Sequence, residues 1–152
     1  MSLRTLLVLA LLVGCGGSKP AETPSGPTGE AEPLGDRKFD DLPPGKKGEY
    51  MKAVVLPQMT KVLQQSPEPE HFTNVTCATC HGPSAKQGNF EMPTASLPKL
   101  GAFEAEMEAH PKMTRYMAEV VVPEMARLLN EAPFDPGTGQ GFGCFGCHMK
   151  KE

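Results

Sequence analysis

Apolar positions recur with helical spacing in two separate segments of the chain. In the first segment they are Met51, Val55, Met59 and Val62. In the second they are Met113, Met117, Val121, Met125 and Leu128. Steps of three and four residues place such side chains along one face of an α-helix. The chain shows no convincing alternation of apolar and polar residues, so the pattern predicts an all-α fold with long loops.

The two predicted helices are also similar to each other in sequence. Residues 50–63 and 116–129 align at an offset of 66, and Tyr, two Met, two Val, Pro and Leu are identical. Seven identities in fourteen positions indicate an internal repeat. We therefore expect two half-repeats, at about 46–110 and 111–152.

A proline stands at the same place in each predicted helix, at Pro57 and at Pro123. A proline inside a helix costs about 3 kcal/mol and leaves the carbonyl four residues back without its donor. The matched positions are explained by a kink that the fold uses, or by two shorter helices that begin at the prolines. The sequence leaves both explanations open.

The chain begins with one short apolar run that ends in Leu12-Val13-Gly14-Cys15. A membrane-spanning helix needs about 20 apolar residues, so this run of about ten predicts an export signal. Its end resembles the lipobox of bacterial lipoproteins. The resemblance implies a signal peptide over 1–14 and a lipid on Cys15. The protein would then be an exported lipoprotein, periplasmic or at the cell surface, anchored to a bacterial membrane. An ordinary secretory signal with a chance cysteine is the alternative.

The stretch after the apolar run has the composition of a linker. From Gly16 to Gly35, thirteen of twenty residues are Gly, Pro, Ser or Thr. Such a segment buries too little apolar surface to offset the entropy of ordering it. We expect a disordered linker over 15–45 and one folded domain over 46–152. The 152 residues and the net charge of -3 exclude a large multidomain enzyme and give no basic surface for nucleic acid.

Four of the five cysteines form two motifs, Cys77-Ala-Thr-Cys80-His81 and Cys144-Phe-Gly-Cys147-His148, at an offset of 67. The pattern Cys-x-x-Cys-His is the attachment sequence of c-type haem. Two thiols two residues apart can bond both vinyl groups of one porphyrin, and the adjacent histidine then gives the iron a nitrogen. The motifs predict two covalently attached haems, with His81 and His148 as axial iron ligands.

Two other chemistries use paired cysteines. Four cysteines can bind zinc, but 63 residues separate the two pairs here, against about 15–20 in a zinc ribbon. A redox-active dithiol needs no histidine after it, and thioredoxin-like motifs lie in a βαβ pattern that this chain lacks. Haem is therefore the favoured cofactor.

The second axial ligand of each iron has to come from upstream of its motif. Only four residues follow His148, so no downstream ligand is available to the second haem. The repeat offers Met59, 18 residues before its motif, and Met125, 19 residues before the other. We favour this pair as the sixth ligands.

Other residues remain possible as sixth ligands. Met51 and Met117 are also matched in the repeat, but they lie 26 and 27 residues before their motifs. His71 and His110 have no partners in the repeat and are weaker candidates. Core packing is an alternative role for any methionine on an apolar helix face.

A helix that carries methionine, followed by Cys-x-x-Cys-His and repeated in tandem, resembles the multihaem cytochrome subunit of photosynthetic reaction centres. The resemblance covers about 46–152, although this chain has two motifs where that family usually has four haems. It implies a small cytochrome c of two tandem half-repeats. It also implies a methionine-ligated electron carrier, with Met59 and Met125 at the matching positions.

These observations predict a membrane-anchored dihaem c-type cytochrome that passes electrons to unidentified redox partner proteins. Methionine ligation raises the potential of haem iron and suits electron transfer. The alternatives are a small haem enzyme or gas sensor, peroxidase-like with one open iron site, and a lipoprotein with zinc clips. Because almost no chain follows the second motif, we expect the second haem to be the more exposed one.

Overall fold

The computed structural model describes residues 34–152, and in this range the chain forms helices joined by long loops. Isolated bridges occur, but the described range contains no sheet, so the prediction of an all-α fold is confirmed there. No helix in the same range is both long and apolar enough to cross a bilayer. The predicted signal peptide, Cys15 and the first part of the linker lie outside the described residues.

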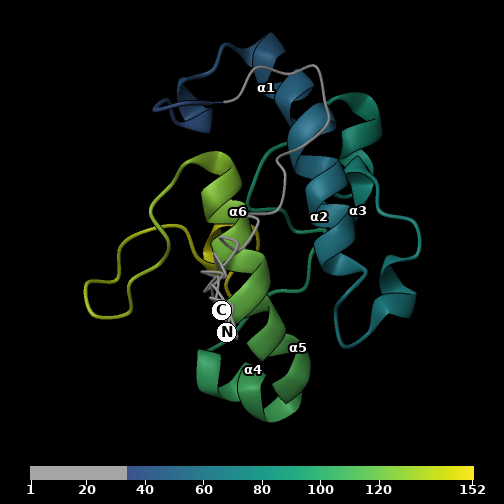
Figure 1. Cartoon of the computed structure of the whole chain (residues 1–152). Helices are drawn as coiled ribbons and strands as arrows, with labels where there is room; N and C mark the ends of the chain where they lie inside the picture. Colours follow the sequence, from purple (N-terminus) through teal and green to yellow (C-terminus); the bar gives the residue numbers. More distant parts are fainter. Residues whose placement is uncertain (1–33) are drawn as a thin grey trace, which may run out of the picture.

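Two long helical segments form the centre of the molecule (Figure 1). The first runs through α1 (Pro44–Tyr50), η2 (Met51–Val55) and α2 (Leu56–Leu63), and the second through α5 (Pro111–Tyr116), η5 (Met117–Val121) and α6 (Val122–Leu129). The other elements are short: η1 (Phe39–Asp41), η3 (Pro69–Phe72), α3 (Cys77–His81), η4 (Pro83–Gln87), α4 (Phe103–Ala109) and η6 (Cys144–Gly146).

The two interior prolines produce one π-helical turn in each long segment. The N–H of Leu56 bonds the carbonyl of Met51, five residues back, and the N–H of Val122 bonds that of Met117 in the same way. A proline has no N–H for the usual bond four residues back, and a π-turn accommodates this by adding one residue to the turn. The flanking residues keep helical backbone angles, so each segment is one continuous helix.

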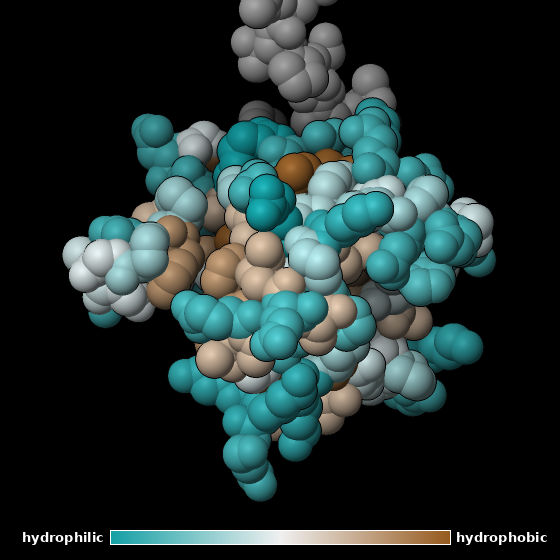
Figure 2. All heavy atoms as spheres, turned by 90° about the horizontal axis from the view of Figure 1, so that it is seen from below, coloured by the Kyte–Doolittle hydropathy of each residue, from teal (hydrophilic) through white to brown (hydrophobic). Residues whose placement is uncertain are grey.

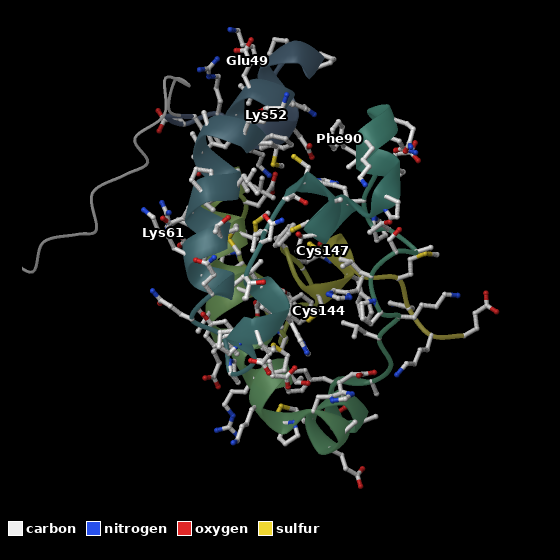
Figure 3. All side chains as sticks on the ribbon, turned by 90° about the vertical axis from the view of Figure 1, so that its right-hand side faces the viewer. Glu49, Lys52, Lys61, Phe90, Cys144 and Cys147 are labelled. Atoms are coloured by element: carbon white, nitrogen blue, oxygen red, sulfur yellow. The ribbon has the colours of Figure 1, made fainter. Side chains whose placement is uncertain are left out.

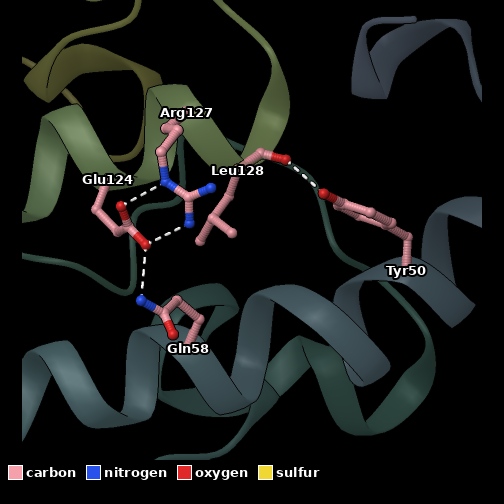
Figure 4. Close-up of polar contacts among 5 residues, drawn as sticks. All are labelled: Tyr50, Gln58, Glu124, Arg127 and Leu128. Atoms are coloured by element: carbon pink, nitrogen blue, oxygen red, sulfur yellow. Dashed lines mark hydrogen bonds and ion pairs between the residues drawn. The ribbon is translucent and has the colours of Figure 1, made fainter. Parts of the chain in front are cut away.

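The two long segments cross antiparallel and are joined by a reciprocal pair of hydrogen bonds. The Tyr50 hydroxyl donates to the carbonyl of Leu128 at 2.8 Å (Figure 4), and the Tyr116 hydroxyl donates to the carbonyl of Val62 at 2.6 Å. Donors and acceptors are both 66 residues apart, so the two contacts are related by an approximate two-fold axis. Each tyrosine also satisfies a carbonyl in the last turn of the other helix, where the chain itself supplies no donor four residues on.

One polar pair lies at this axis. Gln58 and Glu124 occupy equivalent positions, and the Gln58 amide donates to the Glu124 carboxylate at 2.8 Å (Figure 4). The same carboxylate accepts two bonds from Arg127, at 2.8 and 2.7 Å. The Arg127 guanidinium holds the pKa of the Glu124 carboxyl below its usual value. The carboxylate is therefore charged and satisfied between the helices.

The hydrophobic core lies on the first long helix and extends beyond the expected domain boundary. Its buried members are Leu34, Leu42, Tyr50, Val54, Val55, Met59 and Leu128. Residues 34–42 pack over the first half of this helix, and Asn130 donates to the carbonyl of Arg37 at 3.0 Å. The expected linker over 15–45 is therefore wrong for its last part, because Leu34 and Leu42 find apolar partners that lie far along the chain.

We predict that Tyr50→Phe and Tyr116→Phe destabilise the fold unequally. The first change leaves the Leu128 carbonyl with no other donor among the described residues, whereas the Val62 carbonyl keeps the Gln65 N–H at 3.0 Å. We expect a loss of about 1–2 kcal/mol for Tyr50→Phe and about half of that for Tyr116→Phe, measured by chemical denaturation. Equal losses, or none, would show that the tyrosine hydroxyls do not join the helices.

Candidate functional site

The first motif forms one short helix, α3, whose ends are fixed by its own sequence. Thr76 precedes it in extended conformation, and its N–H bonds the Thr79 hydroxyl at 2.9 Å. Gly82 ends it with φ 74 and ψ −175, a conformation that is essentially restricted to glycine. Because Cys77 and Cys80 are three residues apart in a helix, the two thiols lie on one face.

The second motif also forms a single helical turn, although a tighter one. The N–H groups of Cys147 and His148 both bond the carbonyl of Cys144, at 3.2 and 2.9 Å. The glycine between the two cysteines lies against an aromatic ring, because a Cβ on Gly146 would come 2.8 Å from the Phe142 ring. Both motifs thus place two thiols and a histidine on one turn of chain.

A loop between the motifs holds the second motif in place, and we call residues 94–100 the strap. At one end of the strap the N–H of Thr94 bonds the carbonyl of Cys147 at 3.2 Å. At the other end the N–H of Leu100 bonds the carbonyl of Met149, and the Leu100 carbonyl accepts from Lys151, both at 2.9 Å. These bonds form two parallel bridges on either side of Pro98.

The strap contacts the first motif as well. A Cβ on Gly82 would overlap the Ser96 side chain, so the turn after His81 lies directly against the strap. The thiols of Cys80 and Cys147 are near enough to interact electrostatically. In Figure 3, Cys144 and Cys147 lie near the middle of the molecule beside the first long helix. The structure therefore brings both predicted motifs to one site.

The two motif histidines differ in their hydrogen bonds. The Nδ1 atom of His148 lies 2.8 Å from the carbonyl of Pro98, and because a carbonyl only accepts, Nδ1 carries the proton. The Nδ1 atom of His81 is buried and has no hydrogen-bond partner among the described residues. Burial lowers the pKa of the His81 ring, and the nearby Phe90 backbone opposes this in part. Each ring thus has a nitrogen lone pair available for a metal.

The surroundings of the motifs fit a large flat apolar group. Exposed apolar side chains lie within or beside them: Phe90 at 46%, Phe134 at 49%, Phe145 at 42% and Met149 at 37%. The Phe90 ring packs edge-on against the His81 ring, with ring centroids 5.3 Å apart. Figure 2 shows apolar surface between hydrophilic side chains on one face of the molecule. Exposed apolar surface of this kind marks a binding site.

The geometry gives the zinc alternative no support. Between residues 34 and 152 no three His, Cys, Asp or Glu side chains are grouped as metal ligands. Burial raises the pKa of the Cys80 thiol, and it raises that of Cys147 to about 11. Zinc binds the thiolate, so protonated thiols disfavour it. The cysteines of the two motifs form no disulfide.

The candidate sixth ligands lie on the two crossing helices. Met59 is buried in the hydrophobic core, and Met125 packs against the same core. Met51 and Met117 are the half-buried first residues of the two π-turns. Core packing accounts for the position of Met59 without a ligand role. The choice between the two pairs stays a prediction.

The two candidate histidines outside the motifs lie in exposed turns. His71 is 3.4 Å from the Glu68 carboxylate within the turn around η3, and His110 separates α4 from α5. Neither contacts a motif through any bond that the described residues show.

The reason for expecting a more exposed second haem is wrong. That expectation assumed that only residues downstream of His148 cover the second motif, but the strap lies upstream and is bonded along it. The cysteines and histidines of both motifs are half-buried. Sequence reasoning also missed Ser96 and the Pro98 carbonyl, since backbone contacts between distant loops leave no motif.

Comparison with known proteins adds nothing to this picture. No family model, no curated protein and no solved structure matches the chain. The functional argument therefore rests on the motifs and on their geometry.

We predict that Gly82→Ala destabilises the fold more than Gly88→Ala. Both glycines have positive φ, at 74 and 81, but a Cβ meets the strap only at Gly82 and meets nothing within 4 Å at Gly88. We expect about 1 kcal/mol for Gly88→Ala and about 2 kcal/mol more for Gly82→Ala, measured by chemical denaturation. Equal effects would mean that the strap does not pack against the first motif.

Proposed function

We propose that the chain is a dihaem c-type cytochrome that transfers electrons. The observation that carries the proposal is the pair of motifs, each folded as one turn with two free thiols and a neutral-capable histidine, at a single site. The haems would be held by Cys77 with Cys80 and by Cys144 with Cys147. When bound, each haem supplies an iron that cycles between two oxidation states.

The residues of the chain have separable roles in this function. The cysteine thiols hold the cofactor in place, which lets a domain with a small core retain two large groups. His81 and His148 provide the proximal nitrogens, and Phe90 and Phe145 cover apolar surface beside them. Because the strap touches both motifs, the two cofactors would lie close together, and electrons could pass between them.

The helix pair supports a two-repeat architecture of helix followed by motif. The reciprocal tyrosine bonds, the matched π-turns and the motif offset all relate residues 66 or 67 positions apart. This is the arrangement that the resemblance to the reaction-centre cytochrome subunit implies. We propose Met59 and Met125 as the sixth ligands, on the same basis. The lipid on Cys15 would anchor the exported domain near membrane redox partners.

The cofactor content tests the proposed function directly. In a haem-attaching host we expect two haems per chain, low-spin in both oxidation states, with no spectral shift when carbon monoxide is added to the reduced protein. The double change Cys77→Ser with Cys80→Ser removes one haem, and so does the matched change Cys144→Ser with Cys147→Ser. A carbon monoxide shift in the wild-type protein would favour an enzyme or gas sensor, and a colourless protein would refute haem binding.

A second set of variants decides the sixth ligands. Loss of a thioether ligand opens the iron, so we expect Met59→Ala and Met125→Ala each to convert one haem to a high-spin form that binds carbon monoxide. Met51→Ala and Met117→Ala are the matched controls and should leave both haems low-spin. The opposite result would move the assignment to Met51 and Met117.

A further inference from the structure

We propose that the strap makes the two haem sites unequal, so that the second haem has the lower midpoint potential. It does so by giving a hydrogen bond to His148 that His81 lacks. This inference rests on the proposed function, because it concerns the histidines as iron ligands.

The acceptor for His148 is held in a fixed position. The strap is bonded to the second motif through Thr94 at one end and Leu100 at the other, with Pro98 between them. A proline has a fixed φ and no N–H of its own, which limits how the Pro98 carbonyl can turn. This carbonyl lies 2.8 Å from Nδ1 of His148.

The corresponding atom of His81 has no such acceptor. Its Nδ1 is buried without a hydrogen-bond partner among the described residues, and the Phe90 backbone lies near the ring without making a bond of good geometry to Nδ1. Ser84 bonds the His81 backbone carbonyl at 3.2 Å rather than the ring. On this side of the site the strap meets the glycine after the histidine instead of the histidine ring.

This difference acts on the iron through the imidazole ring. An acceptor at Nδ1 makes the other ring nitrogen a stronger electron donor to its metal. A stronger donor stabilises the oxidised iron more than the reduced iron and thereby lowers the potential. The haem on His148 would give up its electron first, and the haem on His81 would hold the electron longer.

Two lysines beside the second motif act in the opposite direction, but weakly. Lys150 lies over the Phe145 ring at 4.7 Å, and Lys151 forms an ion pair with Glu106 at 2.7 Å. A positive charge favours reduced iron. Lys151 is neutralised by its partner, and Lys150 is exposed to screening by water and salt. The direct bond to the ligand ring therefore decides the order of the potentials.

Potentiometric titration of the full dihaem chain tests this order. We expect two one-electron waves, and the Cys144→Ser, Cys147→Ser variant should lose the lower one. Pro98→Gly frees the carbonyl, so it should raise the lower wave and leave the upper wave in place. Pro67→Gly, in an exposed turn after α2 that belongs to neither the motifs nor the strap, is the matched control and should move neither wave.

A nitrogen NMR spectrum of the reduced wild-type protein, labelled at histidine, gives a second readout. We expect one ligand histidine with a strongly hydrogen-bonded Nδ1–H and one without, and the bonded signal should be absent from Pro98→Gly. Two equally bonded signals would overturn the inference even if Pro98→Gly failed to fold. Loss of the upper wave in the cysteine variant would overturn it too. A chain without haem would instead refute the proposed function.

Discussion

The antiparallel crossing of the two proline-containing helices is the contact on which the rest of the molecule depends. Tyr50 and Tyr116 each satisfy a carbonyl at the end of the opposite helix, so neither helix end is complete without the other helix. Each helix is followed, after 14 or 15 residues, by a motif. The crossing thereby determines where the two loops that carry the thiols begin.

The strap then brings together what the helices leave apart. Hydrogen bonds at both of its ends hold the second motif, while Ser96 packs against Gly82 beside the first. One short loop thus positions two chemically similar turns, yet it treats their histidines differently. A difference between two otherwise repeated sites can arise in this way from a segment that is not itself repeated.

Local patterns were enough to predict the helices, the repeat and the motifs, because apolar spacing and motif chemistry are written in neighbouring residues. The matched prolines indicated a distortion, but only the structure shows that the helix continues as a π-turn. The ordering of residues 34–45 was missed because the burial of Leu34 and Leu42 depends on distant side chains. The strap was missed because its bonds to Cys147 and Met149 use backbone groups, which every residue has.

The pair at the two-fold axis, Gln58 and Glu124, shows what joining both halves in one chain allows. In a symmetric homodimer a residue on the axis faces its own copy, so a carboxylate would meet a carboxylate and an amide an amide. Within a single chain the two positions can diverge independently. Here one has become a donor and the other a charged acceptor, so the most symmetric point of the fold is also a place where the halves are chemically distinct.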